Sequence, residues 1–126
     1  MTPGEPPDRK TLGGRGEEIA RDYLKKQKFR IVEVNFRCRC GEIDIIARDS
    51  STLVFIEVKT RRTATYGPPQ LSITPFKQRQ ISKAALTYLA KHSLESVDAR
   101  FDVIGIMLSD GPPVVEHIRN AFDLAY

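Results

Sequence analysis

Three carboxylates and one lysine stand at spacings that could assemble a metal site. Glu17 falls on the apolar stripe of an expected helix over residues 11–27. Asp44 and Glu57 lie in two neighbouring apolar stretches, and Lys59 follows Glu57 by two residues. Mg²⁺ prefers one or two carboxylates together with waters and phosphate oxygens. The residue types therefore point to chemistry on a phosphate.

The expected register brings two of these carboxylates together. Residues 41–48 and 52–59 are expected to be strands joined by a short polar turn, with every second residue on the same face. That register sets Asp44 directly opposite Glu57, with Cβ atoms about 4.5–5.5 Å apart. Like charges so placed destabilise a sheet unless a cation neutralises them, and a divalent ion would do so. The same register predicts three further pairs, Arg48 with Leu53, Ile46 with Phe55 and Glu42 with Lys59.

Each acidic residue also has a purely structural interpretation. Glu57 can pair with Lys59 or an arginine, Asp44 can cap a turn, and Glu17 can extend from the helix surface into water. Glu42 is interpreted as an ion-pair partner or a solvated residue rather than a ligand. A shift of one residue would move the whole set to the opposite face of the sheet. We favour the metal interpretation because three carboxylates and a lysine converge.

The elements that must position these residues form one α/β domain. We expect a mobile tail at residues 1–10, rich in proline and charge, followed by a single domain over residues 11–126. The first three strands have connections too short for parallel pairing, so they should form an antiparallel meander. A helical crossover then makes the fourth strand parallel to the third. The expected elements are helices at 11–27 and 75–92 and strands at 29–36, 41–48, 52–59, 101–108 and 114–118.

The connection before the second helix is expected to be a loop. Residues 60–74 contain Tyr66-Gly67-Pro68-Pro69, which fits no regular element. Thr74 is a suitable N-cap, with Pro75 at the first helical position. The helix is expected to bury seven apolar side chains, those of Phe76, Ile81, Ala84, Ala85, Leu86, Tyr88 and Leu89.

The positive charge is concentrated in one part of the chain. Lys and Arg number 20 against 16 Asp and Glu, a net charge of +4. Residues 58–94 contain no acidic residue and carry seven basic ones: Lys59, Arg61, Arg62, Lys77, Arg79, Lys83 and Lys91. A basic segment of this kind fits a polyphosphate partner such as nucleic acid. A solvated helix face that happens to be basic is the alternative.

Composition excludes several other classes. With 126 residues and 40% hydrophobic residues, the chain fits one soluble domain. It has neither an apolar run of the ~18–20 residues needed to span a membrane nor a signal peptide, so we expect a cytoplasmic protein. Cys38 and Cys40 are too few for a disulfide framework and lack two further zinc ligands nearby. They are expected to be half-buried or buried thiols.

Longer strings resemble a known family. They are Gly16-Glu17-Glu18-Ile19-Ala20, Gly41-Glu42-Ile43-Asp44-Ile45-Ile46-Ala47, Val54-Phe55-Ile56-Glu57-Val58-Lys59-Thr60-Arg61 and Arg100-Phe101-Asp102-Val103. Together they look like the small bacterial YraN family of predicted endonucleases, over about residues 13–122. The acidic residues and Glu57-Val58-Lys59 resemble the Asp…(Asp/Glu)-x-Lys nuclease signature of the restriction-endonuclease-like fold, shared with archaeal Holliday-junction resolvases.

This resemblance implies an αβββαβ core and metal-dependent hydrolysis of phosphodiester bonds in DNA, with branched or junction DNA as a candidate substrate. Asp44 and Glu57 would hold Mg²⁺ or Mn²⁺, together with the Val58 carbonyl and Glu17. Lys59 would orient or help deprotonate the attacking water. Five basic residues would contact the DNA backbone without reading its sequence: Arg61, Arg62, Lys77, Arg79 and Lys83. Resolvase relatives act as dimers, so a homodimer is compatible with the resemblance.

Two other functions fit the same residues. A non-catalytic module could bind nucleic acid on a nuclease-like scaffold, and its binding would tolerate a chelator. A structural interaction protein could have all its carboxylates in ion pairs, and any DNA binding would then depend little on salt.

Overall fold

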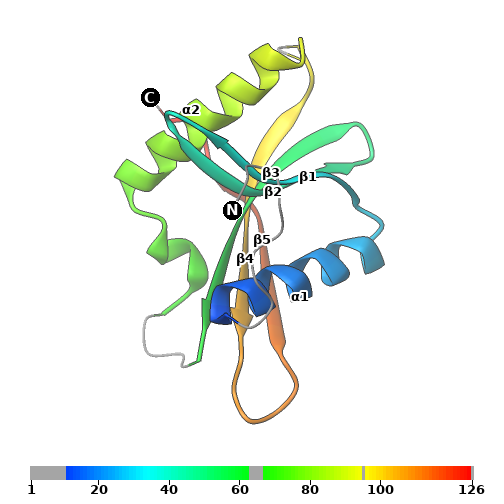
Figure 1. The fold of residues 1–126 in the computed structure, drawn as a ribbon, viewed down its shortest axis with the longest axis vertical. Coiled ribbons are helices and arrows are strands. Elements are labelled where there is room, and N and C mark those ends of the chain that lie inside the picture. The colour runs from blue at the N-terminus through cyan, green and yellow to red at the C-terminus, as the bar shows by residue number, and fades with distance from the viewer. Residues whose placement is uncertain (1–10, 63–66, 95, 126) are drawn as a thin grey trace.

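The computed structural model describes residues 11–62, 67–94 and 96–125, so the tail expected at residues 1–10 lies outside the described residues. The chain folds into a five-stranded mixed sheet with a helix on each face (Figure 1). The strands are β1 (Arg30–Cys38), β2 (Gly41–Asp49), β3 (Thr52–Arg61), β4 (Ala99–Met107) and β5 (Val114–Phe122). The helices are α1 (Leu12–Lys26), α2 (Pro75–Lys91) and a short 3₁₀ helix, η1 (Pro69–Ser72).

The topology is the one the connection lengths predicted. Strands β1, β2 and β3 form an antiparallel meander, and β4 pairs parallel to β3 after the α2 crossover. β5 then returns antiparallel along β4, so the strands stand in sequence order across the sheet. The expected restriction-endonuclease-like αβββαβ core is confirmed, with β5 as an additional edge strand.

The sheet separates two apolar cores. On one face Phe55 and Phe101 pack with Tyr88 of α2, and on the other Ile56 packs with Leu24 of α1. Successive residues of β3 therefore point to different helices, as the two-residue period of a strand requires. A strand buried on both faces reads as a nearly continuous apolar run, which is the pattern of β3.

Two sequence predictions about the second half of the chain are wrong in part. Phe76 is 62% exposed and Leu86 is 37% exposed, although both were expected to be buried. The buried side of α2 repeats every three or four residues through Ile81, Ala84, Ala85 and Tyr88. Residues 69–72 form η1 rather than an irregular loop, because proline suits the first position of a helical turn. Tyr66, also assigned to that loop, lies outside the described residues.

Two other expectations, on the cysteines and on the start of α2, are met. Cys38 and Cys40 are both free and half-buried. Thr74 caps α2, because its hydroxyl accepts a hydrogen bond from the Lys77 N–H at 3.2 Å. No helix in the described part of the chain is long and apolar enough to cross a membrane.

A glycine brings α1 directly against the sheet. A Cβ atom on Gly16 would lie 1.8 Å from Thr60 Oγ1 of β3, so only glycine permits this approach. Thr11 caps the same helix by accepting a hydrogen bond from the Gly14 N–H at 2.8 Å. The close packing fixes the height of α1 over the sheet and therefore the position of the next residue, Glu17.

A buried polar cluster attaches β5 to the rest of the fold. Asp102 on β4 accepts hydrogen bonds from Arg100 and from the Asn120 N–H, and its other oxygen lies 2.8 Å from His117 Nε2. Tyr23 of α1 completes the cluster, with its hydroxyl 3.0 Å from His117 Nδ1. Burial alone would raise the pKa of Asp102, but the hydrogen bonds with His117 and Arg100 outweigh burial and lower it.

Candidate active site

The register between β2 and β3 is the predicted one, but the paired region is shorter. Arg48 pairs with Leu53 and Ile46 pairs with Phe55, as expected. The last pair at this end joins Ile45 with Ile56, so Asp44 and Glu57 lie one residue beyond it. Neither Asp44 with Glu57 nor Glu42 with Lys59 is a pair of the ladder. The two strands part where the acidic residues begin.

Where the ladder between β2 and β3 ends, the Asp44 carboxylate accepts a hydrogen bond from the backbone of β3. The Val58 N–H donates to Asp44 Oδ2 at 2.8 Å, so a side chain satisfies a backbone donor that β2 no longer reaches. This hydrogen bond fixes Asp44 beside β3. It also places the Val58 peptide next to the acidic residues.

Two ammonium groups surround Glu57. The Glu57 residue is only 6% exposed, whereas the side chains of Lys59 and Lys77 are about one-third exposed. Lys59 Nζ lies 3.8 Å and Lys77 Nζ lies 3.9 Å from the same Glu57 oxygen. Lys77 reaches this position from the first turn of α2. These separations leave charge attraction rather than short hydrogen bonds as the main interaction.

Burial, followed by the charge of neighbouring acidic residues, raises the pKa values of all three carboxyl groups. Burial is the main cause that raises the pKa of Glu57 to about 8, and the charge of Asp44 adds to it against the opposing effect of the two lysines. Burial and the neighbouring Asp44 likewise raise the pKa of Glu17 to about 8. The pKa of Asp44 is raised by burial despite the Val58 hydrogen bond. The three groups therefore resist being ionised together near neutral pH.

The route by which Glu17 joins the cluster differs from the expected one. Helix α1 packs on the face of the sheet opposite α2, whereas Glu57 interacts with Lys77 of α2. Glu17 nevertheless interacts with Asp44 through charge and a side-chain hydrogen bond. The contact is possible because β2 and β3 have parted there, which lets residues from the two faces approach each other.

Glu42 has the role that sequence reasoning gave it. Its Oε2 lies 2.9 Å from Arg37 Nε in a partly exposed ion pair. Its negative charge also contributes to the raised pKa of Asp44, after burial. Glu42 is thus an ion-paired neighbour of the acidic residues.

The predicted backbone-contacting residues separate into three groups. Lys77 lies at the acidic residues, a position that sequence spacing did not reveal but that the capped start of α2 explains. Arg61 donates to the Gly67 carbonyl and to Ser72 Oγ, so it fastens η1 to the end of β3. The other three lie at the surface or half-buried, namely Arg62, Arg79 and Lys83.

We call Glu17, Asp44, Glu57, Lys59 and Lys77 the acidic centre. Across the described residues, no group of three or more His, Cys, Asp or Glu side chains is already arranged to hold a metal ion. A Mg²⁺-like ion needs only one or two carboxylates from the protein, since water and phosphate supply the rest. The donor set fits such an ion, because it would neutralise two adjacent carboxylates whose pKa values are raised by burial and by the charge of neighbouring acidic residues.

Comparisons with known proteins show one consistent relationship. The model of a family described as "Uncharacterised protein family UPF0102" matches residues 16–106. A UPF0102 protein of Geotalea uraniireducens (strain Rf4) is 63% identical over 120 residues, covering 94% of each chain. A UPF0102 protein of Geobacter sulfurreducens is 63% identical over 118 residues, covering 93% of this chain and 92% of the other.

A structural comparison is much weaker. A solved structure described as "Crystal structure of SSO0001" is 19% identical, with a TM-score of 0.36, over 89% of this chain and 52% of that chain.

Proposed function

We propose that this chain, which belongs to the uncharacterised protein family UPF0102, is a divalent-metal-dependent nuclease that hydrolyses phosphodiester bonds in DNA. The family is the YraN-like group that the sequence strings resemble. One observation carries the proposal. Glu57 is buried and Asp44 is half-buried, both have raised pKa values, and they lie where β2 and β3 part and beside two lysines.

The acidic residues would hold the ion in a shared position. Asp44 and Glu57 would bind Mg²⁺ or Mn²⁺, with the Val58 carbonyl and Glu17 as further ligands. When bound, the ion supplies a hydroxide nucleophile near neutral pH and neutralises charge on the phosphate. A cation would also replace the proton that the raised pKa of Glu57 retains.

The two lysines supply the remaining charge. Lys59 and Lys77 are partly exposed, so a phosphate arriving from solvent can reach both ammonium groups. Lys59 would orient the attacking water or help its deprotonation by stabilising the negative charge that forms on it, and Lys77 would stabilise negative charge on the phosphate oxygens. Arg62, Arg79 and Lys83 would contact neighbouring phosphates, which positions DNA without reading its sequence.

A cleavage panel tests this function. Wild type, Lys59→Ala and Asp44→Asn are incubated with labelled flap, junction, nicked, linear and single-stranded DNA in Mn²⁺ or in chelator. Wild type should cleave at least one DNA in Mn²⁺ and none in chelator. Both variants should lose about 100-fold or more of the rate, because each removes a group acting at the reacting phosphate. Lys91→Ala is the matched control, since it removes a charge at the far end of α2 and should retain full activity.

A second function would follow from a specific failure. Lys59 and Lys77 already oppose the charge of Glu57 without a metal, which favours a non-catalytic nucleic-acid-binding module as the alternative. Absence of cleavage from every DNA, together with binding that is insensitive to chelator, would overturn the nuclease proposal and support that module. Salt-independent binding would count against both.

A further inference from the structure

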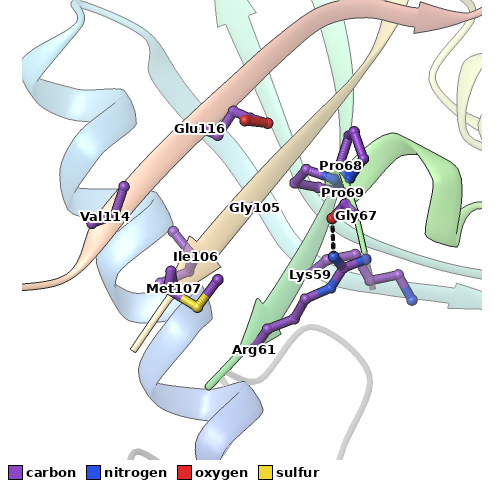
Figure 2. Close-up of a pocket in the computed structure, with 10 residues that line it drawn as sticks. All are labelled: Lys59, Arg61, Gly67, Pro68, Pro69, Gly105, Ile106, Met107, Val114 and Glu116. Atoms are coloured by element: carbon purple, nitrogen blue, oxygen red, sulfur yellow. Dashed lines mark hydrogen bonds between the residues drawn. The ribbon is translucent and has the colours of Figure 1, made fainter. Parts of the chain in front are cut away.

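A pocket of about 290 Å³ adjoins the acidic centre along Lys59. Its walls come from the end of β3, the start of η1, and the strands β4 and β5 (Figure 2). Lys59 lines the pocket, and its terminal nitrogen points away from Gly105 in Figure 2 and lies 3.8 Å from Glu57. One side chain therefore separates the pocket from the acidic centre.

The pocket has two apolar walls above a floor without a side chain. Gly105 of β4 forms the floor, and a Cβ there would lie 2.2 Å from Pro69 Cγ, so the proline ring rests against bare backbone. Pro68 and Pro69 lie on one side of Gly105 and Val114 lies on the other (Figure 2). Val114 is 60% exposed, which leaves the slot open to solvent. The shape suits a flat apolar group that enters from outside.

Two charged groups stand at the edges of the slot. The guanidinium of Arg61 is held in place by the Gly67 carbonyl and by Ser72 Oγ, and it lines one side. Glu116 of β5 lies on the opposite wall from the prolines (Figure 2). An arginine plane stacks well on an aromatic base, and a carboxylate accepts hydrogen bonds from the amino group of a base.

We infer that this pocket binds an unpaired nucleobase of the strand whose phosphate occupies the acidic centre, an inference that rests on the proposed function. In a nucleotide the sugar alone separates the base from its phosphate, and here, among the described residues, Lys59 alone both lines the pocket and reaches to 3.8 Å from Glu57. A base stacked inside a duplex cannot enter the slot. The substrate class is therefore DNA with an unpaired nucleotide at the reacting phosphate, as in a flap, gap or single strand.

Binding in chelator tests the pocket without any cleavage. Wild-type affinity is measured by fluorescence anisotropy for a gapped DNA, for the same DNA with abasic nucleotides in the gap, and for a continuous duplex. Abasic nucleotides keep every phosphate and remove only the bases. Wild type should bind the gapped DNA about tenfold more tightly than the abasic DNA, which is the contribution of one stacked base.

Two variants locate that preference in the pocket. Val114→Glu places a carboxylate in the apolar wall, and Gly105→Ala displaces Pro69 from the floor. Each should reduce the ratio between gapped and abasic DNA to near one. Val32→Glu changes a 39% exposed valine on β1 in the same way and should leave the ratio unchanged. Thermal melting identifies any variant that fails to fold. If Gly105→Ala does not fold, the result for Val114→Glu, at an exposed position, tests the pocket by itself.

The outcomes separate the pocket from the nuclease activity. A wild-type ratio near one, no measurable binding to any of the three DNAs, or a ratio that survives Val114→Glu overturns the pocket assignment. Cleavage in Mn²⁺ can persist in each of the cases in which DNA still binds. A tenfold ratio that is lost only in the pocket variants supports the assignment, and it does so even if Mn²⁺ produces no cleavage.

Discussion

Replacing Glu57 with glutamine tests whether the charge of the acidic centre is balanced by binding a cation. The pKa of Glu57 is raised on folding from 4.5 to about 8, mainly by burial and by the charge of Asp44. The unfolded chain therefore releases this proton at lower pH than the folded chain does. Between pH 4.5 and pH 8 the folded state binds more protons, so its stability falls as the pH rises.

The size of the effect follows from the same values. At about 1.4 kcal/mol per pH unit, Glu57 alone removes on the order of 3 kcal/mol of folding free energy between pH 4.5 and pH 7. This net value already includes the favourable attraction of Lys59 and Lys77. For a domain of this size it corresponds to a fall of roughly 10 °C in the melting temperature. Glu17, whose pKa is also raised to about 8, shifts stability in the same direction.

Thermal melts at pH 5, 6, 7 and 8, in chelator and in Mn²⁺, measure how the melting temperature depends on pH and on the metal ion. Wild type should melt progressively lower in chelator as the pH rises, and Mn²⁺ should restore stability at pH 8 far more than at pH 5. Glu57→Gln keeps the shape and removes the charge, so its melting temperature should depend less on pH and respond little to Mn²⁺. Asp22→Asn, an exposed carboxylate on α1, should behave as wild type.

Two results would refute this reasoning. The first is a wild-type melting temperature in chelator that stays constant or rises from pH 5 to pH 8. The second is a Glu57→Gln variant that keeps the full pH dependence and the full response to Mn²⁺. Either result would mean that the charge of Glu57 is compensated within the protein itself.

Two further predictions concern the support of the site and its surroundings. Gly16→Ala should destabilise the fold by about 1–3 kcal/mol in thermal melts and weaken the Mn²⁺ response, because the added Cβ collides with Thr60 and moves Glu17. Gly13→Ala is the control: its Cβ meets no atom within 4 Å from outside its own turn, so it should be neutral or slightly stabilising. Phe76→Ser should change stability by less than about 0.5 kcal/mol, because the ring is 62% exposed. The same variant should weaken single-stranded DNA binding several-fold in fluorescence anisotropy, because exposed aromatic rings stack on bases, whereas Leu86→Ser, further along α2, should leave the affinity unchanged.

Short-range rules predicted most of the sheet and its register. The tight turn between β2 and β3 allows only antiparallel pairing, and alternation along the strands then sets Ile46 opposite Phe55. Thr74 and Pro75 marked the start of α2 because capping depends only on neighbouring residues. These signals are local in sequence, so one chain is sufficient to detect them.

The features that single-chain reasoning missed depend on three-dimensional packing. The apolar run of β3 continues on both sides of Glu57, and nothing in it indicates that β2 departs after Ile45. The position of Lys77 beside Glu57 depends on how α2 lies across the sheet, which no spacing along the chain encodes. Phe76 was assigned to the core on its apolar character alone, although its place in the first turn of α2 leaves it exposed.

The parting of β2 and β3 explains several features of the acidic centre. A continuous ladder would have joined the Val58 N–H to the backbone of β2, and the parted strands give that donor to the Asp44 carboxylate. The same opening lets Glu17 reach Asp44 from the far face while Lys77 reaches Glu57 from the near one. Buried carboxylates with raised pKa values reduce the stability of the metal-free fold, and such groups gather at functional sites where a ligand reverses that penalty. A cation held at this opening would stabilise the ionised acidic residues and, through them, the fold. The stability of the protein should therefore depend on pH and on the metal ion together.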